Sequence, residues 1–213
     1  MDRAGAIAKG LLSVKAVFLR PNEPFIWSSG IKSPIYCDNR LTLSNVQVRR
    51  GVEQALADVV REMHPDCEML MGTATAGIAH AAIAAYLLDV PMGYVRGNSK
   101  DHGRNKQIEG SFEKGQKIVV IEDLISTAGS CVDVVECLRE AGAEVLGIVS
   151  IFSYDMKTGI ERIQGAKIKN TSLVNLDMLL DVAVNEGYIE KNDVLAIKSF
   201  RDNPFDESWI MKK

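Results

Sequence analysis

The chain has 213 residues, of which 46% are hydrophobic and 25% are charged, and its formal net charge is −3. This length is sufficient for one domain with its own core, without metal or disulfide cross-links. The composition is that of an average soluble protein without the roughly 20-residue apolar run of a membrane span, and the slightly acidic charge does not favour a nucleic-acid surface.

Neither the N-terminus nor the cysteines indicate export. The apolar segment 6–12 is too short for the core of a signal peptide, and no small-residue cleavage site follows it. The four cysteines are scattered without a CxxC pair, which argues against a zinc site or a redox motif: Cys37, Cys67, Cys131 and Cys137. We therefore expect a cytoplasmic protein with reduced thiols.

The predicted secondary structure begins with a helix over 44–64, capped by Ser44 and stopped by Pro65. Short apolar runs then alternate with amphipathic stretches, the pattern of a parallel sheet covered by helices. The strands are expected at 69–71, 91–95, 117–121, 145–151 and 171–175, and the later helices at 78–88, 129–141, 160–164, 176–185 and 191–200. The strand at 117–121 is rich in β-branched residues and is expected to end at two acids, Glu122 and Asp123.

These elements predict a single α/β domain over 1–213. Its core, about 44–175, is expected to be a doubly wound, mainly parallel sheet, and the segments 1–43 and 176–213 are expected to form a small hood. We expect Met69, Met71, Trp27 and the alanines of 81–85 to pack in the core or in the hood. His64 and His80 are expected to cap helices or face solvent, and no chemistry is assigned to them.

The strongest functional pattern follows the strand at 117–121. Ligands of parallel sheets bind beyond the carboxyl ends of the strands, where Glu122 and Asp123 would accept hydrogen bonds from ribose hydroxyls or hold a cation. The small, hydroxyl-rich residues 126–130 lead directly into a helix, whose N-terminal N–H groups suit a phosphate. Together these features predict a ribose 5-phosphate site.

Other interpretations of these residues are weaker. Asp123 or Ser126 could simply cap the following helix. The loop 72–77 has the glycine spacing of a P-loop, but Ile78 and Ala79 stand where its lysine and its Ser/Thr belong, and no G-x-G-x-x-G follows a strand.

Longer motifs add a family resemblance. The string 122–130, EDLISTAGS, resembles the motif by which type I phosphoribosyltransferases bind phosphoribosyl pyrophosphate (PRPP). Within that superfamily, the segment 25–38 resembles the part of orotate phosphoribosyltransferases that holds orotate. Arg96 with 100–103 resembles their mobile catalytic loop, and 72–77 resembles their pyrophosphate loop. The resemblance therefore implies an orotate phosphoribosyltransferase of pyrimidine (UMP) biosynthesis.

The resemblance also implies a set of site residues. The catalytic residues would be Lys100, His102 and Asp123. PRPP would be bound by Thr73, Ala74, Arg96, Lys100, His102, Glu122, Asp123, Leu124, Ile125, Ser126, Thr127, Ala128, Gly129 and Ser130. Orotate would be bound by Lys32, Tyr36, Cys37, Ser126 and Thr127. The cofactor would be Mg²⁺, held mainly by PRPP with a possible contribution from Asp123, and a homodimer would share the catalytic loop between subunits.

Several roles stay open on the sequence. His102 could be a proton donor or a solvated helper, and Tyr36 could stack on the pyrimidine or only pack. Gly97 stands where the family commonly has a second basic residue, and 152–154 lack the arginine that holds orotate in some members. The alternatives to the main interpretation are a phosphoribosyltransferase for another base and a non-catalytic PRPP-sensing regulator.

Overall fold

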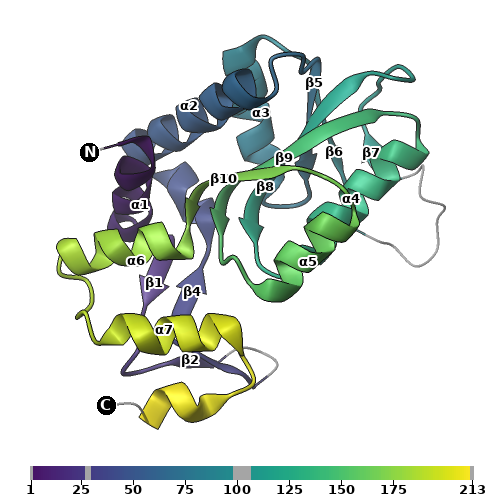
Figure 1. Cartoon of the computed structure of the whole chain (residues 1–213). Helices are drawn as coiled ribbons and strands as arrows, with labels where there is room; N and C mark the ends of the chain where they lie inside the picture. Colours follow the sequence, from purple (N-terminus) through teal and green to yellow (C-terminus); the bar gives the residue numbers. More distant parts are fainter. Residues whose placement is uncertain (1, 27–29, 98–106, 212–213) are drawn as a thin grey trace.

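A six-stranded sheet, in the order β10-β9-β8-β5-β6-β7, forms the centre of the computed structural model, which describes residues 2–26, 30–97 and 107–211 (Figure 1). The strands are β5 (Met69–Thr73), β6 (Met92–Val95), β7 (Ile108–Glu109), β8 (Lys117–Ile125), β9 (Glu144–Ser153) and β10 (Asn170–Asn175). β7 is antiparallel to β6, whereas the other neighbouring strands of this sheet run parallel. The predicted doubly wound, mainly parallel α/β fold is confirmed.

Helices cover both faces of this sheet (Figure 1). One face carries α1 (Arg3–Ser13), α2 (Val46–Met63) and α3 (Gly77–Leu88), and the other carries α4 (Gly129–Glu140) and α5 (Lys157–Gly165). A hydrophobic core lies on each face of the sheet, and alternate residues of β8 point into one or the other. Val119 and Ile121 pack with α1–α3, whereas Ile118 and Val120 pack with α4 and α5. This division follows from the two-residue period of a strand that is buried on both faces.

The two ends of the chain lie together beside the sheet (Figure 1). The N-terminal part contributes β1 (Val17–Leu19), β2 (Phe25–Ile26), β3 (Lys32–Ser33), β4 (Ile35–Cys37) and the 3₁₀ helix η1 (Asn39–Ser44). The C-terminal part contributes α6 (Leu176–Asn185), α7 (Asp193–Asp202) and η3 (Glu207–Met211). Lys32 and Glu207 join the two parts by a 2.9 Å ion pair. The predicted boundaries between core and hood stay a prediction.

The prediction that a strand ends before the two acids is wrong. β8 continues through Glu122 and Asp123 to Ile125, and its ladder with β9 pairs Glu122 with Ser150. Because β9 itself extends to Ser153, the residues after Ile121 find main-chain partners. The two acids therefore lie on a rigid strand.

The predicted cap of the first long helix is also wrong by one residue. Ser44 ends η1, and the side chain of Asn45 accepts hydrogen bonds from the N–H groups of Gln47 and Val48. Asn45 therefore caps α2, a role for which its short amide side chain is well suited. The other predicted helices and strands agree with the structure to within a few residues.

The interior residues match the prediction only in part. Met69 and Met71 are buried, but Ala82 is exposed, and Trp27 lies outside the described residues. His80 is buried between α2 and α3, with its Nδ1 2.6 Å from Oε1 of the buried Glu53, so the expectation of a capping or solvent-facing side chain is wrong. His64 occupies the C-cap position of α2, as predicted, but it is buried.

All four cysteines are free thiols. Within the ranges that the structure describes, none of the helices combines the length and the apolar character needed to cross a membrane.

Candidate active site

The topological switch point of the sheet, where the strand order reverses direction, lies between β5 and β8. From β5 the chain continues to β6 and β7 on one side, and it then returns to β8 on the other side. Open α/β sheets bind ligands at the carboxyl ends of the strands next to such a switch. A Cβ at Gly77 would lie 2.6 Å from the carbonyl oxygen of Ile121, so glycine allows the start of α3 to approach β8 closely. The loop 73–77 and the segment 122–130 are thus neighbours.

The two acids of β8 occupy different environments. Glu122 is 4% exposed, its Oε1 accepts the N–H of Asp123 at 2.9 Å, and its Oε2 has no hydrogen-bond partner among the described residues. Burial raises the pKa of Glu122 well above its ordinary value, and the neighbouring Asp123 carboxyl adds to this effect. Asp123 is partly exposed. Asp123 is therefore the accessible carboxylate, whereas the environment of Glu122 favours its neutral form.

The turn after β8 leaves the start of α4 open. Ala128 occupies the N-cap position in the left-handed conformation, with φ at 59°, and no side chain caps the helix. The alternative in which Asp123 or Ser126 caps α4 is therefore wrong. The first N–H groups of α4, with the hydroxyls of 126–130, are placed where an anion would complete their hydrogen bonds.

Asn39, which no sequence pattern singles out, connects the predicted orotate segment to the two acids. It is fully buried, and its Nδ2 donates to the main-chain oxygen of Asp123 at 2.7 Å. Burial raises the pKa of the neighbouring Cys37 thiol, and the charge of Asp123 contributes, which places Cys37 near the same strand end. Asn39 is the first residue of η1, and its contact partner Asp123 lies 84 positions away, so no local sequence pattern predicts this contact.

Tyr36 and Tyr154 lie on the same side of the site. Tyr36 is 44% exposed, and its ring centroid is 5.6 Å from that of Phe25. Tyr154 follows β9, and its N–H donates to the Ile125 carbonyl at 2.9 Å. Burial raises the pKa of the Tyr154 phenol, with smaller effects from Cys37 and Tyr36. The structure thus brings Tyr36 and Cys37 together with Tyr154 near Asp123.

The predicted pyrophosphate contacts are only partly described. Arg96 directly follows β6, and its Nη2 lies 3.0 Å from Oε1 of Glu109. The N–H of Ala74 donates to the Val95 carbonyl at 3.0 Å, which favours Thr75 and Ala76 over Ala74 as donors to a ligand. The catalytic residues predicted at Lys100 and His102 lie outside the described residues.

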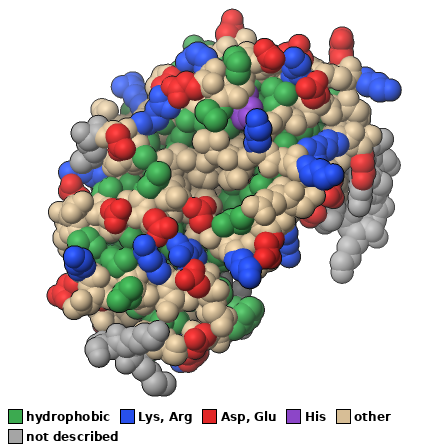
Figure 2. Space-filling model, in the orientation of Figure 1, with side chains coloured by type: hydrophobic (Ala, Val, Ile, Leu, Met, Phe, Trp, Pro, Cys, Tyr) green, Lys and Arg blue, Asp and Glu red, His purple; other side chains and the backbone are tan. Residues whose placement is uncertain are grey.

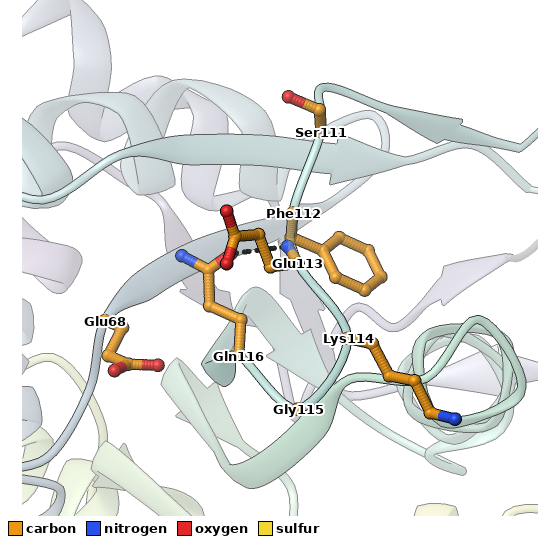
Figure 3. Close-up of a pocket in the computed structure, with 7 residues that line it drawn as sticks. All are labelled: Glu68, Ser111, Phe112, Glu113, Lys114, Gly115 and Gln116. Carbon is orange, nitrogen blue, oxygen red and sulfur yellow. Dashed lines mark hydrogen bonds between the residues drawn. The ribbon is translucent and has the colours of Figure 1, made fainter.

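A cavity of about 680 Å³ lies elsewhere, at the amino end of β8 (Figure 3). It is lined by Glu68 and residues 111–116, where Oε1 of Gln116 accepts the N–H of Glu113 at 3.0 Å. Substrates of parallel sheets bind at the opposite, carboxyl ends of the strands. We therefore assign the substrates to the edge that carries Asp123, not to this cavity.

Comparisons with known proteins show the family of the chain. A family model described as "Phosphoribosyl transferase domain" matches residues 43–180. The chain is 53% identical to the orotate phosphoribosyltransferase of Bacillus cereus (strain G9842), over 96% of this chain and 97% of the relative.

Solved structures give the same result. The orotate phosphoribosyltransferase of Aeropyrum pernix aligns with a TM-score of 0.74 and 30% identity, over 86% of this chain and 99% of that one. The UMP synthase of Leishmania donovani aligns with a TM-score of 0.78 and 28% identity, over 93% of this chain and 42% of that chain. Because one relative shares half of its residues with this chain over nearly its whole length, the chain belongs to the orotate phosphoribosyltransferase family.

Proposed function

We propose that this chain transfers ribose 5-phosphate from PRPP to orotate in pyrimidine (UMP) biosynthesis, giving orotidine 5′-phosphate and pyrophosphate. One observation carries the proposal: at the switch point, the accessible carboxylate of Asp123 is followed within a few residues by the uncapped N-terminus of α4. A carboxylate suits ribose hydroxyls, and free N–H groups suit a phosphate. The choice of orotate as the base rests on the names of the relatives.

The reaction displaces pyrophosphate from the anomeric carbon by a ring nitrogen of orotate. Positive charge develops on the ribose and negative charge on the leaving group, so catalysis is chiefly alignment and electrostatic stabilisation. Asp123 holds the ribose hydroxyls, with the buried carboxyl of Glu122 beside it, and residues 126–130 hold the 5′-phosphate. Arg96 and the N–H groups of the 73–77 loop contact the pyrophosphate.

The sequence adds Lys100 and His102 to the pyrophosphate site. Both are cationic or can become so, and either can protonate the departing pyrophosphate.

The site is suited to magnesium bound mainly through the substrate. Among residues 2–26, 30–97 and 107–211, no group of three or more His, Cys, Asp or Glu side chains could hold a metal ion. Asp123 is the accessible carboxylate at the strand end, and PRPP supplies further oxygens, the ligands that Mg²⁺ prefers. When bound, Mg²⁺ neutralises charge on the pyrophosphate.

Orotate is expected between the strand end of β8 and the hood. Tyr36 offers an exposed ring face to the pyrimidine, while the main chain around Tyr36 and Cys37 offers polar groups. Lys32 is the cationic candidate for the orotate carboxylate, and its Nζ lies 2.9 Å from Oε2 of Glu207, which leaves further N–H donors of the ammonium group for a ligand. Thr127 and Ser126 complete the set of predicted orotate contacts.

A cytoplasmic homodimer is the expected assembly. Helix α3 is apolar nearly all round, and its outer face leaves Tyr86 85% exposed and Leu87 39% exposed. Helices of this kind are normally covered, and a second copy of the chain supplies a matching face. A partner there would lie beside β6, from which the chain enters the catalytic loop.

The proposal is tested with a panel of bases. Purified protein is mixed with PRPP, Mg²⁺ and one base at a time, and the loss of base absorbance is followed. We expect turnover with orotate. Turnover with adenine, hypoxanthine or uracil but not with orotate would identify an enzyme for another base.

The same experiment separates an enzyme from a PRPP-sensing regulator. A regulator would bind PRPP without consuming any base, and as a nucleic-acid-binding protein it would be expected to have a basic surface. On the face drawn in Figure 2, Lys and Arg are interspersed with Asp and Glu, which supports the enzyme.

A further inference from the structure

Helix α5 contacts the turn 126–130 from outside the site. Nη1 of Arg162 donates to the carbonyl oxygen of Thr127 at 2.9 Å. Gly159, three residues earlier on the same helix face, lies against the carbonyl oxygen of Ser126, at a distance that no Cβ could occupy. Two consecutive carbonyl groups of the turn therefore face one helix, that of Thr127 through a hydrogen bond and that of Ser126 through close packing.

These contacts fix the direction of two N–H groups. In a trans peptide unit, the carbonyl of one residue and the N–H of the next point in opposite directions. The Ser126 carbonyl shares its unit with the N–H of Thr127, and the Thr127 carbonyl shares its unit with the N–H of Ala128. Because both carbonyls face α5, both N–H groups face away from it.

The neighbouring backbone continues this arrangement. The Ala128 carbonyl accepts the N–H of Val132, so the carbonyls of Thr127 and Ala128 both accept hydrogen bonds within the protein, while the carbonyl of Ser126 lies against α5. Among the described residues, no main-chain acceptor takes the N–H of Thr127 or of Ala128. The left-handed conformation of Ala128 is of the kind found where successive N–H groups form an anion-binding nest.

We propose that Arg162 and Gly159 are positioning residues for phosphate binding, which orient the N–H groups of Thr127 and Ala128 toward the 5′-phosphate of PRPP. The inference rests on the proposed function, because it takes the turn 126–130 as the site of that phosphate. Arg162 acts through the Thr127 carbonyl, and it also adds a positive charge next to an anion. Loss of Arg162 should therefore weaken the binding of phosphate-bearing ligands and leave the binding of orotate unchanged.

The first test compares two arginines of similar geometry. Arg139 donates to the carbonyls of Ala166 and Lys167, at the C-terminal end of α5, so Arg139→Ala removes an equivalent contact away from the turn. Calorimetric titration with ribose 5-phosphate and steady-state kinetics are performed on both variants. We expect Arg162→Ala to weaken ribose 5-phosphate binding and to raise KM for PRPP by about tenfold, the loss typical of one charge-assisted hydrogen bond. Arg139→Ala should match the wild type, and Arg162→Lys should recover part of the affinity.

The second test uses two glycines of α5. Gly159→Ala introduces a methyl group against the Ser126 carbonyl, whereas Gly165 has no atom within 4 Å of its Cβ position. Both changes raise helix propensity by about the same amount. Of these two variants, we expect only Gly159→Ala to bind ribose 5-phosphate more weakly than the wild type. Thermal unfolding of each variant checks that it is folded.

Two results would overturn the inference: wild-type affinity for ribose 5-phosphate in Arg162→Ala and Gly159→Ala, or a KM for orotate that rises as much as that for PRPP. A purely structural role of α5 would also shift the Arg139→Ala and Gly165→Ala controls. The proposed function fails separately, if wild-type protein does not consume orotate. Selective loss of ribose 5-phosphate binding would still support the role of Arg162 in that case.

Discussion

At the scale of single residues, Glu122 makes stability depend on pH. Its carboxyl is buried and its pKa is raised well above the ordinary value, so the folded protein keeps this proton over a pH range in which the unfolded chain has lost it. The free energy of unfolding must then fall as pH rises from about 4.5, the ordinary value, toward the raised pKa. The slope for one proton is about 1.4 kcal/mol per pH unit.

Glu122→Gln removes this titration. Urea unfolding at pH 5, 6, 7 and 8, at one protein concentration, is therefore expected to give a flatter pH dependence in the variant than in the wild type. The difference between the two curves isolates Glu122, since other groups titrate in both proteins. Parallel curves would mean that Glu122 ionises normally.

The residue types at the site could be predicted better than their environments. The acids and the hydroxyl-rich turn were found because their order along the chain is specific. The burial of Glu122 and the contact of Asn39 with Asp123 could not be found, since both depend on residues far away in the sequence. The contact between Arg162 and Thr127 joins residues 35 positions apart and has the same cause.

At the scale of elements, the start of α2 provides a sharp test. Asn45→Ala removes the side-chain oxygen that accepts two N–H groups, so we expect the free energy of unfolding to fall by about 1 kcal/mol. Ser44→Ala, one residue earlier on an exposed position, should change it by less than about 0.5 kcal/mol. Chemical denaturation measures the free energy of unfolding of both variants. A larger loss in Ser44→Ala than in Asn45→Ala would mean that Ser44 caps α2, as the sequence predicted.

The predicted ends of the elements are wrong where contacts with distant parts of the chain determine where an element ends. The alternation of apolar residues predicted the strand up to Ile121, but the continuation to Ile125 depends on pairing with β9. The short strands β1–β4 and the helix α1 were not predicted. The strands have only two or three residues each, too few to show a periodic pattern, and α1 packs against α6 from the other end of the chain. The central helices and strands have strong periodicity of their own and were predicted well.

At the scale of the whole molecule, the proposed dimer shares its catalytic loop between subunits. Lys100→Ala and Asp123→Ala should each abolish activity, but a re-equilibrated equal mixture should recover about a quarter of wild-type activity. Random exchange makes half of the dimers mixed, and each mixed dimer has one intact site. Activity of the mixture is compared with that of each parent. A mixture as inactive as its parents would contradict shared sites.

The most direct test of the account is a crystal structure of the protein with orotidine 5′-phosphate. We predict that the ribose hydroxyls lie within about 3 Å of the carboxylate of Asp123, with the phosphate in the turn 126–130 and the pyrimidine beside Tyr36. A ligand bound instead in the cavity lined by Glu68 and residues 111–116, or elsewhere away from the carboxyl end of β8, would contradict the assignment of the site.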